Sequence, residues 1–166
     1  MELDVDIEEP WPPGPWEELA DRSAAALAEV APELASPRLS TSILFTSDDE
    51  VHALNREWRQ RDMPTNVLSF PMLERSALLH LTPDGPPELL GDIALSYATC
   101  AREAADKGIS IEDHTAHLIV HSLLHLAGYD HDLGAEQADA MEALEVKALA
   151  LIGVADPYED RDQGQG

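Results

Sequence analysis

The chain has 166 residues, and its 10 Lys or Arg residues against 33 Asp or Glu residues give a formal net charge of −23. This length favours one domain, and a hydrophobic content of 44% supplies a real core, which argues against global disorder. The acidic balance argues against loose adhesion to nucleic acid or anionic membranes, although one local basic site could still hold RNA.

Apolar residues in the first part of the chain follow either the alternation of a strand or the spacing of a helix. Ser47 and Glu50 have the spacing of a capping box, which predicts that a helix begins directly after Ser47. The expected elements are a strand over Leu3–Ile7, a helix over Trp16–Val30, a strand over Leu39–Thr46, a helix over about Asp48–Trp58 and a strand over Asn66–Phe70.

The second part of the chain is predicted to be mainly helical. Pro71–Pro87 is expected to be mostly loop, and Gly128 is expected to end the helix that holds most of the histidines. The remaining expected elements are a strand over Glu88–Leu95 and helices over Ser96–Lys107, from Ser110 to Gly128, and over Ala135–Leu151. The pattern predicts an α+β fold with a mixed sheet of about four strands covered by about five helices. One domain is expected over residues 1–154, followed by an acidic, flexible tail over residues 155–166.

The location of the protein is also predicted from the sequence. Cys100 is the single cysteine, so no internal disulfide can form, which fits a reducing cytoplasm. The first nine residues carry five acids and no base, unlike a secretory signal. No stretch approaches the roughly 18 apolar residues of a membrane helix. We therefore expect a cytoplasmic protein without a membrane partner.

Five of the seven histidines lie between His114 and His131. His121 and His125 are four residues apart on a predicted helix, so both imidazoles project from nearly the same face. Gly128 lets the chain leave this helix in a left-handed turn, which allows His131 to return to the same ion. Three imidazoles with an open position are typical of a catalytic Zn²⁺. Two histidines at this spacing, with nothing else, usually do not form a metal site. The glycine and the third histidine favour a metal site here.

Two neighbouring residues limit the interpretation of this site. His117 lies on the same stripe, but His117 and His125 would be about 12 Å apart on a straight helix, too far for one ion. His117 is therefore interpreted as a core residue or as support for a ligand. The spacing also occurs in metzincin proteases, whose general-base Glu is replaced here by Ser122. A metal-dependent peptidase is therefore a weaker alternative.

A local basic cluster precedes the third predicted strand. Arg56, Arg59 and Arg61 lie within six positions of each other in a chain with few cations. A guanidinium matches the oxygens of a phosphate. Arginines also favour the C-terminal end of a helix, and composition alone favours that structural interpretation.

Taken together, these segments resemble the YbeY family of bacterial rRNA maturation factors and endoribonucleases, from about Thr41 to Tyr158. The matching segments are Leu54–Asn55 with Trp58–Arg59, Asp62–Pro71, Gly91–Ile93, His117–His131, Met141–Glu145 and Asp156–Tyr158. One departure is Ser122, because the family usually has Gly after the first metal histidine. The larger side chain bears on how substrate reaches the metal.

The resemblance implies one zinc ion held by His121, His125 and His131, with Arg59 as a functional residue near the metal. It implies a single-strand endoribonuclease that acts in 16S rRNA 3′-end maturation and ribosome quality control in the cytoplasm. The implied partners are rRNA and the small ribosomal subunit, with a small-subunit ribosomal protein and a ribosome-assembly GTPase in some members.

The working hypothesis is hydrolysis of an RNA phosphodiester, with a zinc-activated water and with Arg59 stabilising charge on the phosphate. The general base stays open among Asp92, Asp113, Asp130 and the RNA 2′-hydroxyl, and Asp130 could instead support a ligand imidazole. A second hypothesis, from another class, is a ribosome assembly factor with a structural metal.

Overall fold

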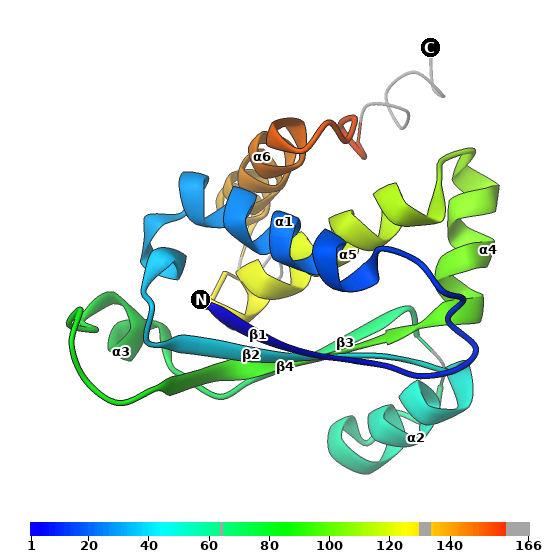
Figure 1. Ribbon diagram of the computed structural model, residues 1–166, viewed down its shortest axis with the longest axis horizontal. Helices are drawn as coiled ribbons and strands as arrows, with labels where there is room; N and C mark the ends of the chain where they lie inside the picture. The colour runs from blue at the N-terminus through cyan, green and yellow to red at the C-terminus, as the bar shows by residue number, and fades with distance from the viewer. Residues whose placement is uncertain (64, 130–133, 159–166) are drawn as a thin grey trace.

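A four-stranded mixed sheet forms the centre of the computed structural model, which describes residues 1–63, 65–129 and 134–158 (Figure 1). The strands are β1 (Glu2–Ile7), β2 (Leu39–Thr46), β3 (Val67–Pro71) and β4 (Glu88–Ser96), in the order β1-β2-β4-β3. β1, β2 and β4 run parallel, whereas β3 is antiparallel to β4. The predicted α+β class and four-stranded mixed sheet are therefore confirmed.

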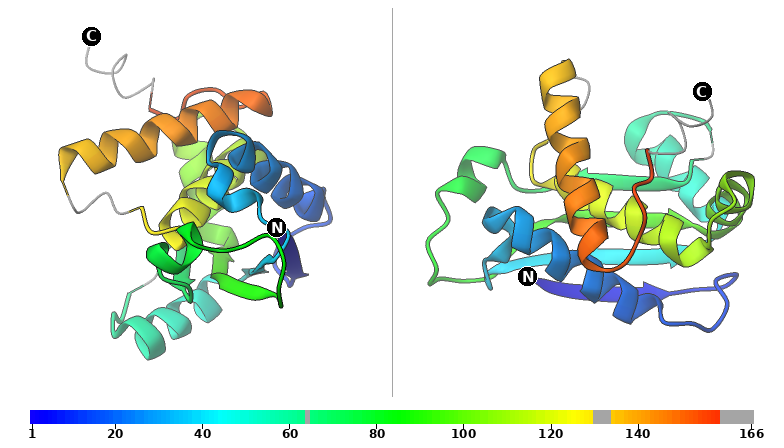
Figure 2. Two further views of the ribbon diagram at one scale, coloured as in Figure 1. Left: turned by 90° about the vertical axis from the view of Figure 1, so that its left-hand side faces the viewer. Right: turned by 90° about the horizontal axis from the view of Figure 1, so that it is seen from above.

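Helices lie on both faces of this sheet. α1 and α5 pack on one face, α6 lies against these two helices, and α2 lies on the opposite face (Figures 1 and 2). The helices are α1 (Trp16–Val30), α2 (Asp48–Arg59), α3 (Arg75–Leu79), α4 (Tyr97–Lys107), α5 (Ile111–Leu126) and α6 (Ala135–Leu151), with a 3₁₀ helix, η1 (Pro32–Ala35). The predicted order of the long helices and strands is confirmed.

The alternation in β2 separates a buried face of the sheet from a partly open one. Thr41, Ile43 and Phe45 are buried, and the last two belong to the main core formed with α1 and α5. Ser42 and Leu44 point to the other face and are only partly buried. A smaller buried cluster under α2 consists of Val51, Leu68 and Ala94.

The predicted helix boundaries follow from local hydrogen bonds. Ser47 Oγ accepts a hydrogen bond from the Glu50 backbone N–H at 3.1 Å, which caps α2. Ser110 Oγ accepts one from the Asp113 N–H, also at 3.1 Å, and caps α5. Gly128, two residues after the end of α5, has a φ of +97°, so the predicted left-handed turn is confirmed.

Two short helical segments were not predicted from the sequence. α3 lies within the segment expected to be mostly loop, and η1 follows α1. Each buries one leucine, Leu78 in α3 and Leu34 in η1. Such short segments are stabilised by tertiary packing and leave no detectable periodicity in the sequence. The described residues therefore form six α-helices, where about five were expected.

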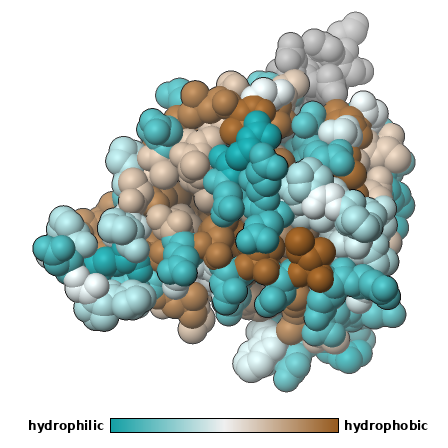
Figure 3. Space-filling view, in the orientation of Figure 1, coloured by the Kyte–Doolittle hydropathy of each residue, from teal (hydrophilic) through white to brown (hydrophobic). Residues whose placement is uncertain are grey.

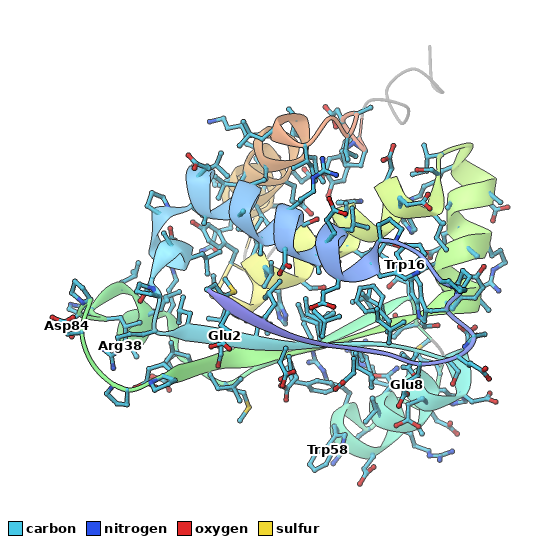
Figure 4. The ribbon with its side chains drawn as sticks, in the orientation of Figure 1. Glu2, Glu8, Trp16, Arg38, Trp58 and Asp84 are labelled. Carbon is cyan, nitrogen blue, oxygen red and sulfur yellow. The ribbon has the colours of Figure 1, made fainter. Side chains whose placement is uncertain are left out.

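Arg38 holds the long connection between β3 and β4 (Figure 4). Its guanidinium donates hydrogen bonds to the backbone oxygens of Thr82 and Pro86, each at 3.0 Å. It also forms an ion pair with Glu88 at 3.4 Å. These contacts fix the loop against the start of β2.

The surface is mixed in character. Hydrophobic residues appear in separate patches between hydrophilic ones on the side that Figure 3 shows. Trp58 on α2 is 66% exposed (Figure 4) and borders a cavity that Leu44 and Ala94 of the sheet also line. Within the part of the chain that the structure describes, no helix combines the length and the apolarity that a membrane crossing requires.

Candidate functional site

α5 presents His121 and His125 to a pocket of about 570 Å³. Ile119 and Leu123 on the same helix are fully buried in the core, which fixes the rotation of α5 about its axis. The two half-buried histidines therefore face the pocket together. The other walls come from the end of α2, from β3, from α4 and from Tyr158.

Arg59 reaches the same pocket from the end of α2. The helix ends directly after this residue because Gln60 adopts a left-handed φ of +58°. Arg59 Nη2 donates a hydrogen bond to the Ser69 backbone oxygen at 2.6 Å, and its guanidinium lies 5.5 Å from the centre of the Phe70 ring. The arginine is thus anchored to β3 beside the histidine pair.

Ser69 also contacts one of the histidines. Its hydroxyl oxygen lies 2.6 Å from Nδ1 of His125. Because Ser69 contacts Arg59 through its backbone oxygen and His125 through its side chain, this single residue sets the relative positions of the two groups.

A buried carboxylate lies behind the other histidine. Nδ1 of His121 donates to Oε1 of Glu145 on α6 at 2.8 Å, and Nε2 of His117 donates to the same oxygen at 3.2 Å. The Tyr158 hydroxyl donates to Oε2 at 2.8 Å. Burial raises the pKa of Glu145, but the hydrogen bonds from His117 and His121 outweigh it and lower the pKa to about 2. Glu145 is therefore a carboxylate at neutral pH.

The far wall of the pocket contains a second acid–histidine pair. Nε2 of the buried His114 lies 2.9 Å from Oε1 of Glu103, which also accepts a hydrogen bond from Asn66 Nδ2 at 2.9 Å. Burial raises the pKa of Glu103, but the hydrogen bonds from His114 and Asn66 outweigh it, so the pKa lies below its ordinary value. Burial lowers the pKa of His114. These contacts join α4 and α5 to Asn66, the residue directly before β3.

The pocket has more cations than the composition predicts. Arg59, Arg61 and Lys107 all border it, three of the ten basic residues of a chain whose formal net charge is −23. Arg56, the third arginine of the sequence cluster, is exposed and lies 4.0 Å from Asp62 instead. Two of the three clustered arginines thus border the histidine pocket, together with a lysine from α4.

Two acids considered as general bases lie elsewhere. Asp92 borders a cavity of about 740 Å³ between α2 and the open face of the sheet. Asp113, in the first turn of α5, borders a third cavity, of about 540 Å³. Neither borders the histidine pocket. Asp130 and His131 lie outside the described residues, so the structure does not place them.

The donor set fits zinc. Histidines that bind zinc through one nitrogen usually hydrogen-bond through the other to a carboxylate, a carbonyl or another polar group, which fixes the ring and its tautomer. Nδ1 of His121 and Nδ1 of His125 have such partners in Glu145 and Ser69. The Glu145 carboxylate requires a proton on Nδ1 of His121, which leaves Nε2 of that ring as the nitrogen that could hold a metal. The Ser69 hydroxyl is able to accept from Nδ1 of His125, and in that arrangement Nε2 of His125 would be the matching nitrogen. Within residues 1–63, 65–129 and 134–158, no three histidine, cysteine or acidic side chains form a candidate metal cluster. Of the three histidines that the sequence suggests as ligands, the described residues include His121 and His125.

The sequence predicted His121, His125 and Arg59 as site residues but missed Ser69 and Glu145 as their partners. His125 is 56 positions from Ser69, and His121 is 24 positions from Glu145. No local pattern reveals contacts at these separations. Both residues do lie in segments that carry the family resemblance, and this resemblance is the signal that could have identified them as site residues.

Comparison with known proteins gives one consistent result. A family model described as Endoribonuclease YbeY matches residues 14–153. The Endoribonuclease YbeY of Erythrobacter litoralis is 63% identical over 161 residues, covering 97% of this chain and 99% of that protein. That of Novosphingobium aromaticivorans is 56% identical over 162 residues, covering 96% and 97%. The solution structure of TM1509 from Thermotoga maritima shares the fold, with a TM-score of 0.58 at 21% identity over 98% of this chain and 93% of that one.

Proposed function

This chain belongs to the YbeY family of endoribonucleases, and we propose that it hydrolyses RNA phosphodiester bonds at the pocket that His121, His125 and Arg59 share. One observation carries the proposal. A pair of potential metal ligands and three cations border a single pocket of an otherwise strongly acidic protein. Such a pocket is the local basic site that RNA requires, because phosphate contacts dominate the affinity for nucleic acid.

We propose that zinc is the cofactor and that Nε2 of His121 and Nε2 of His125 hold it together with His131. The partners of the two Nδ1 atoms support this assignment. A bound zinc ion supplies Lewis acidity for a water molecule or a phosphoryl oxygen. The third ligand rests on the spacing of His131 after Gly128 in the sequence.

The role proposed for Arg59 is to bind the scissile phosphate and to stabilise the charge that develops on it. One of its five N–H groups is used on the Ser69 backbone oxygen, so the guanidinium is oriented before substrate arrives. Arg61 and Lys107 lie on two different walls of the pocket and are suited to hold neighbouring phosphates. These cations define a path for a single strand across the histidines.

The physiological substrate that we propose is the 3′ end of 16S rRNA, processed in the cytoplasm on the small ribosomal subunit. A small-subunit ribosomal protein and a ribosome-assembly GTPase are the proposed partners. This part of the proposal is supported by the family to which the chain belongs, and the open, basic pocket suits a single strand.

The first test compares two arginines on the same helix. Single-stranded RNA labelled at one end is incubated with zinc-loaded parent, Arg59→Ala and Arg56→Ala proteins, all purified in the same way. We expect Arg59→Ala to lose about 100-fold or more in cleavage rate, as for other groups that stabilise transition-state charge. Arg56→Ala removes an exposed arginine that does not border the pocket, so its rate stays within about 2-fold of the parent.

A folded Arg59→Ala protein that cleaves at the parent rate contradicts the proposed site. A parent protein that binds the small subunit but cleaves no RNA favours the assembly-factor hypothesis instead. Unstructured peptide serves as the control substrate, and its cleavage would revive the peptidase alternative.

A further inference from the structure

We propose that Glu145 is a positioning residue that fixes the tautomer of His121, so that Nε2 of His121 carries the lone pair for the metal, whereas Nε2 of His117 is protonated. This inference rests on the metal site of the proposed function. It assigns a role to the Met141–Glu145 segment of α6, which the reaction outlined above does not use.

Glu145 occupies a buried position, where a charged side chain disfavours folding. It is 0% exposed, the one carboxylic acid among the described residues that is fully buried. Its neighbours on the inner face of α6 are Met141, Ala148 and Leu149, all buried and apolar. An apolar side chain at position 145 would continue this packing face, because burying a charge disfavours folding unless the charge is fully hydrogen-bonded. Helix packing therefore gives no reason for an acid here.

The hydrogen bonds of Glu145 explain why an acid is present. Oε1 lies 2.8 Å from Nδ1 of His121 and 3.2 Å from Nε2 of His117. An acceptor oxygen requires a proton on each of these nitrogens. The same oxygen therefore gives the two rings opposite tautomers, Nδ1–H in His121 and Nε2–H in His117.

This difference distinguishes two histidines on one face of α5. In the neutral Nδ1–H tautomer, the Nε2 lone pair of His121 is the one that a metal can use. In His117, Nε2 is the protonated nitrogen, and Nδ1 is buried without a hydrogen-bond partner among the described residues. His117 thus cannot replace His121 as a ligand in this arrangement.

Tyr158 completes the set of contacts on Glu145. Its hydroxyl donates to Oε2 at 2.8 Å and lies 3.2 Å from Nε2 of His117. It contacts the oxygen that does not face His121, so it holds the carboxylate in place and leaves Oε1 to the histidines. We expect Tyr158→Phe to weaken zinc binding less than the removal of the carboxylate does.

The first experiment reads the tautomers directly. Ring nitrogens of the metal-free parent protein are observed by ¹⁵N NMR, with signals assigned through the His117→Asn and His121→Asn variants. We expect protonation on Nδ1 of His121 and on Nε2 of His117. An Nε2–H tautomer at His121 overturns the proposal, and this measurement needs no variant at Glu145.

The second experiment measures zinc affinity by competition with a chelator. Glu145→Met fills a similar volume without an acceptor and is expected to bind zinc about 10- to 100-fold more weakly than the parent, the usual effect of losing the partner of a ligand histidine. Glu145→Gln keeps an acceptor oxygen and is expected to lose less. Asp139→Asn makes a matched carboxylate-to-amide change at an exposed position of α6 and should not alter the affinity.

The outcomes separate this inference from the proposed function. A folded Glu145→Met protein with parent affinity for zinc overturns the positioning role alone. A parent protein that binds no zinc overturns the metal site and this role together. If Glu145→Met fails to fold by circular dichroism, the parent tautomers and the affinity of Glu145→Gln decide the question.

Discussion

At the scale of single residues, Ser69 connects the proposed metal ligand His125 to the proposed phosphate-binding residue Arg59. Its hydroxyl contacts Nδ1 of His125 at 2.6 Å, and its backbone oxygen accepts from Arg59 at 2.6 Å. The hydroxyl can be removed by mutation, whereas the backbone contact cannot. A mutation can therefore test the contact with His125 separately from the contact with Arg59.

We predict that Ser69→Ala weakens zinc binding about 10-fold, because the His125 ring loses the partner that orients it. The guanidinium of Arg59 should keep its place, since its contact is with the backbone. Zinc affinity is measured by chelator competition, with Ser42→Ala on the opposite face of the sheet as control. Equal affinities for Ser69→Ala and the parent would show that the hydroxyl does not orient a ligand.

At the scale of elements, α2 caps α4. Asp48 Oδ1 accepts hydrogen bonds from the Ser96 hydroxyl and from the Thr99 N–H, the latter at 3.2 Å, and Oδ2 accepts from the Thr99 hydroxyl at 2.9 Å. A carboxylate at a helix N-terminus also interacts favourably with the helix dipole. This contact joins the helix that carries Arg59 to the one that carries Lys107.

The Asp48 contact gives stability a defined pH dependence. Burial raises the pKa of Asp48, but the hydrogen bonds from Ser96 and Thr99 outweigh it, so the pKa lies below its ordinary value of 3.8. A lowered pKa stabilises the fold at pH values above the unfolded pKa, and this contribution is lost as the pH falls through the folded pKa. We predict that Asp48→Asn lowers the free energy of unfolding by about 1 kcal/mol at pH 7. Urea unfolding at pH 7 and at about pH 3 checks this, and a deficit that does not shrink at the lower pH contradicts it.

The end of α5 provides a second prediction at this scale. Gly128 has a φ of +97°, and a Cβ there would lie 2.7 Å from Cβ of Arg75. Arg75 donates to the Ala127 backbone oxygen at 2.7 Å and forms an ion pair with Glu33 at 3.0 Å, so it is not free to move away. The turn that leaves α5 toward His131 is thus closely packed.

We predict that Gly128→Ala lowers the free energy of unfolding by about 2 kcal/mol or more, whereas Gly108→Ala lowers it by about 1 kcal/mol. Gly108 has a φ of +70°, and apart from Gly108, its chain neighbours and the adjoining helix backbone, no atom of the described residues lies within 4 Å of the position that a Cβ would take there. Its substitution therefore measures the backbone cost alone. Denaturant unfolding of both variants gives the difference. Equal losses would show that Arg75 adapts without cost.

The sequence alone predicts those features of the fold that depend on local patterns, such as helix ends. The start of α5 at Ser110 and its end at Gly128 are correct because capping and left-handed turns leave local signatures. α3 was missed because burial of one side chain, Leu78, stabilises it. The strand order and the partners of His121 and His125 depend on contacts between distant segments, which one sequence does not encode as a pattern. The third ligand, His131, and the zinc ion stay predictions.

At the scale of the whole molecule, charge is unevenly distributed. The chain carries 33 acids against 10 bases, yet three of the bases border one pocket. On the proposed function, the acidic surface repels nucleic acid, and Arg59, Arg61 and Lys107 supply local positive charge at the pocket. We expect such a distribution to limit non-specific binding of RNA elsewhere on the surface.

The buried contact between α5 and α6 also has a consequence for biosynthesis. During translation, α2, β3 and α5 leave the ribosome before α6, because domains are made from the N-terminus at about 5–20 residues per second. Until α6 docks, His121 lacks the carboxylate that orients it. On our proposals, the zinc site therefore matures late in synthesis, because a nascent chain binds zinc weakly until α6 has been made and has docked against α5.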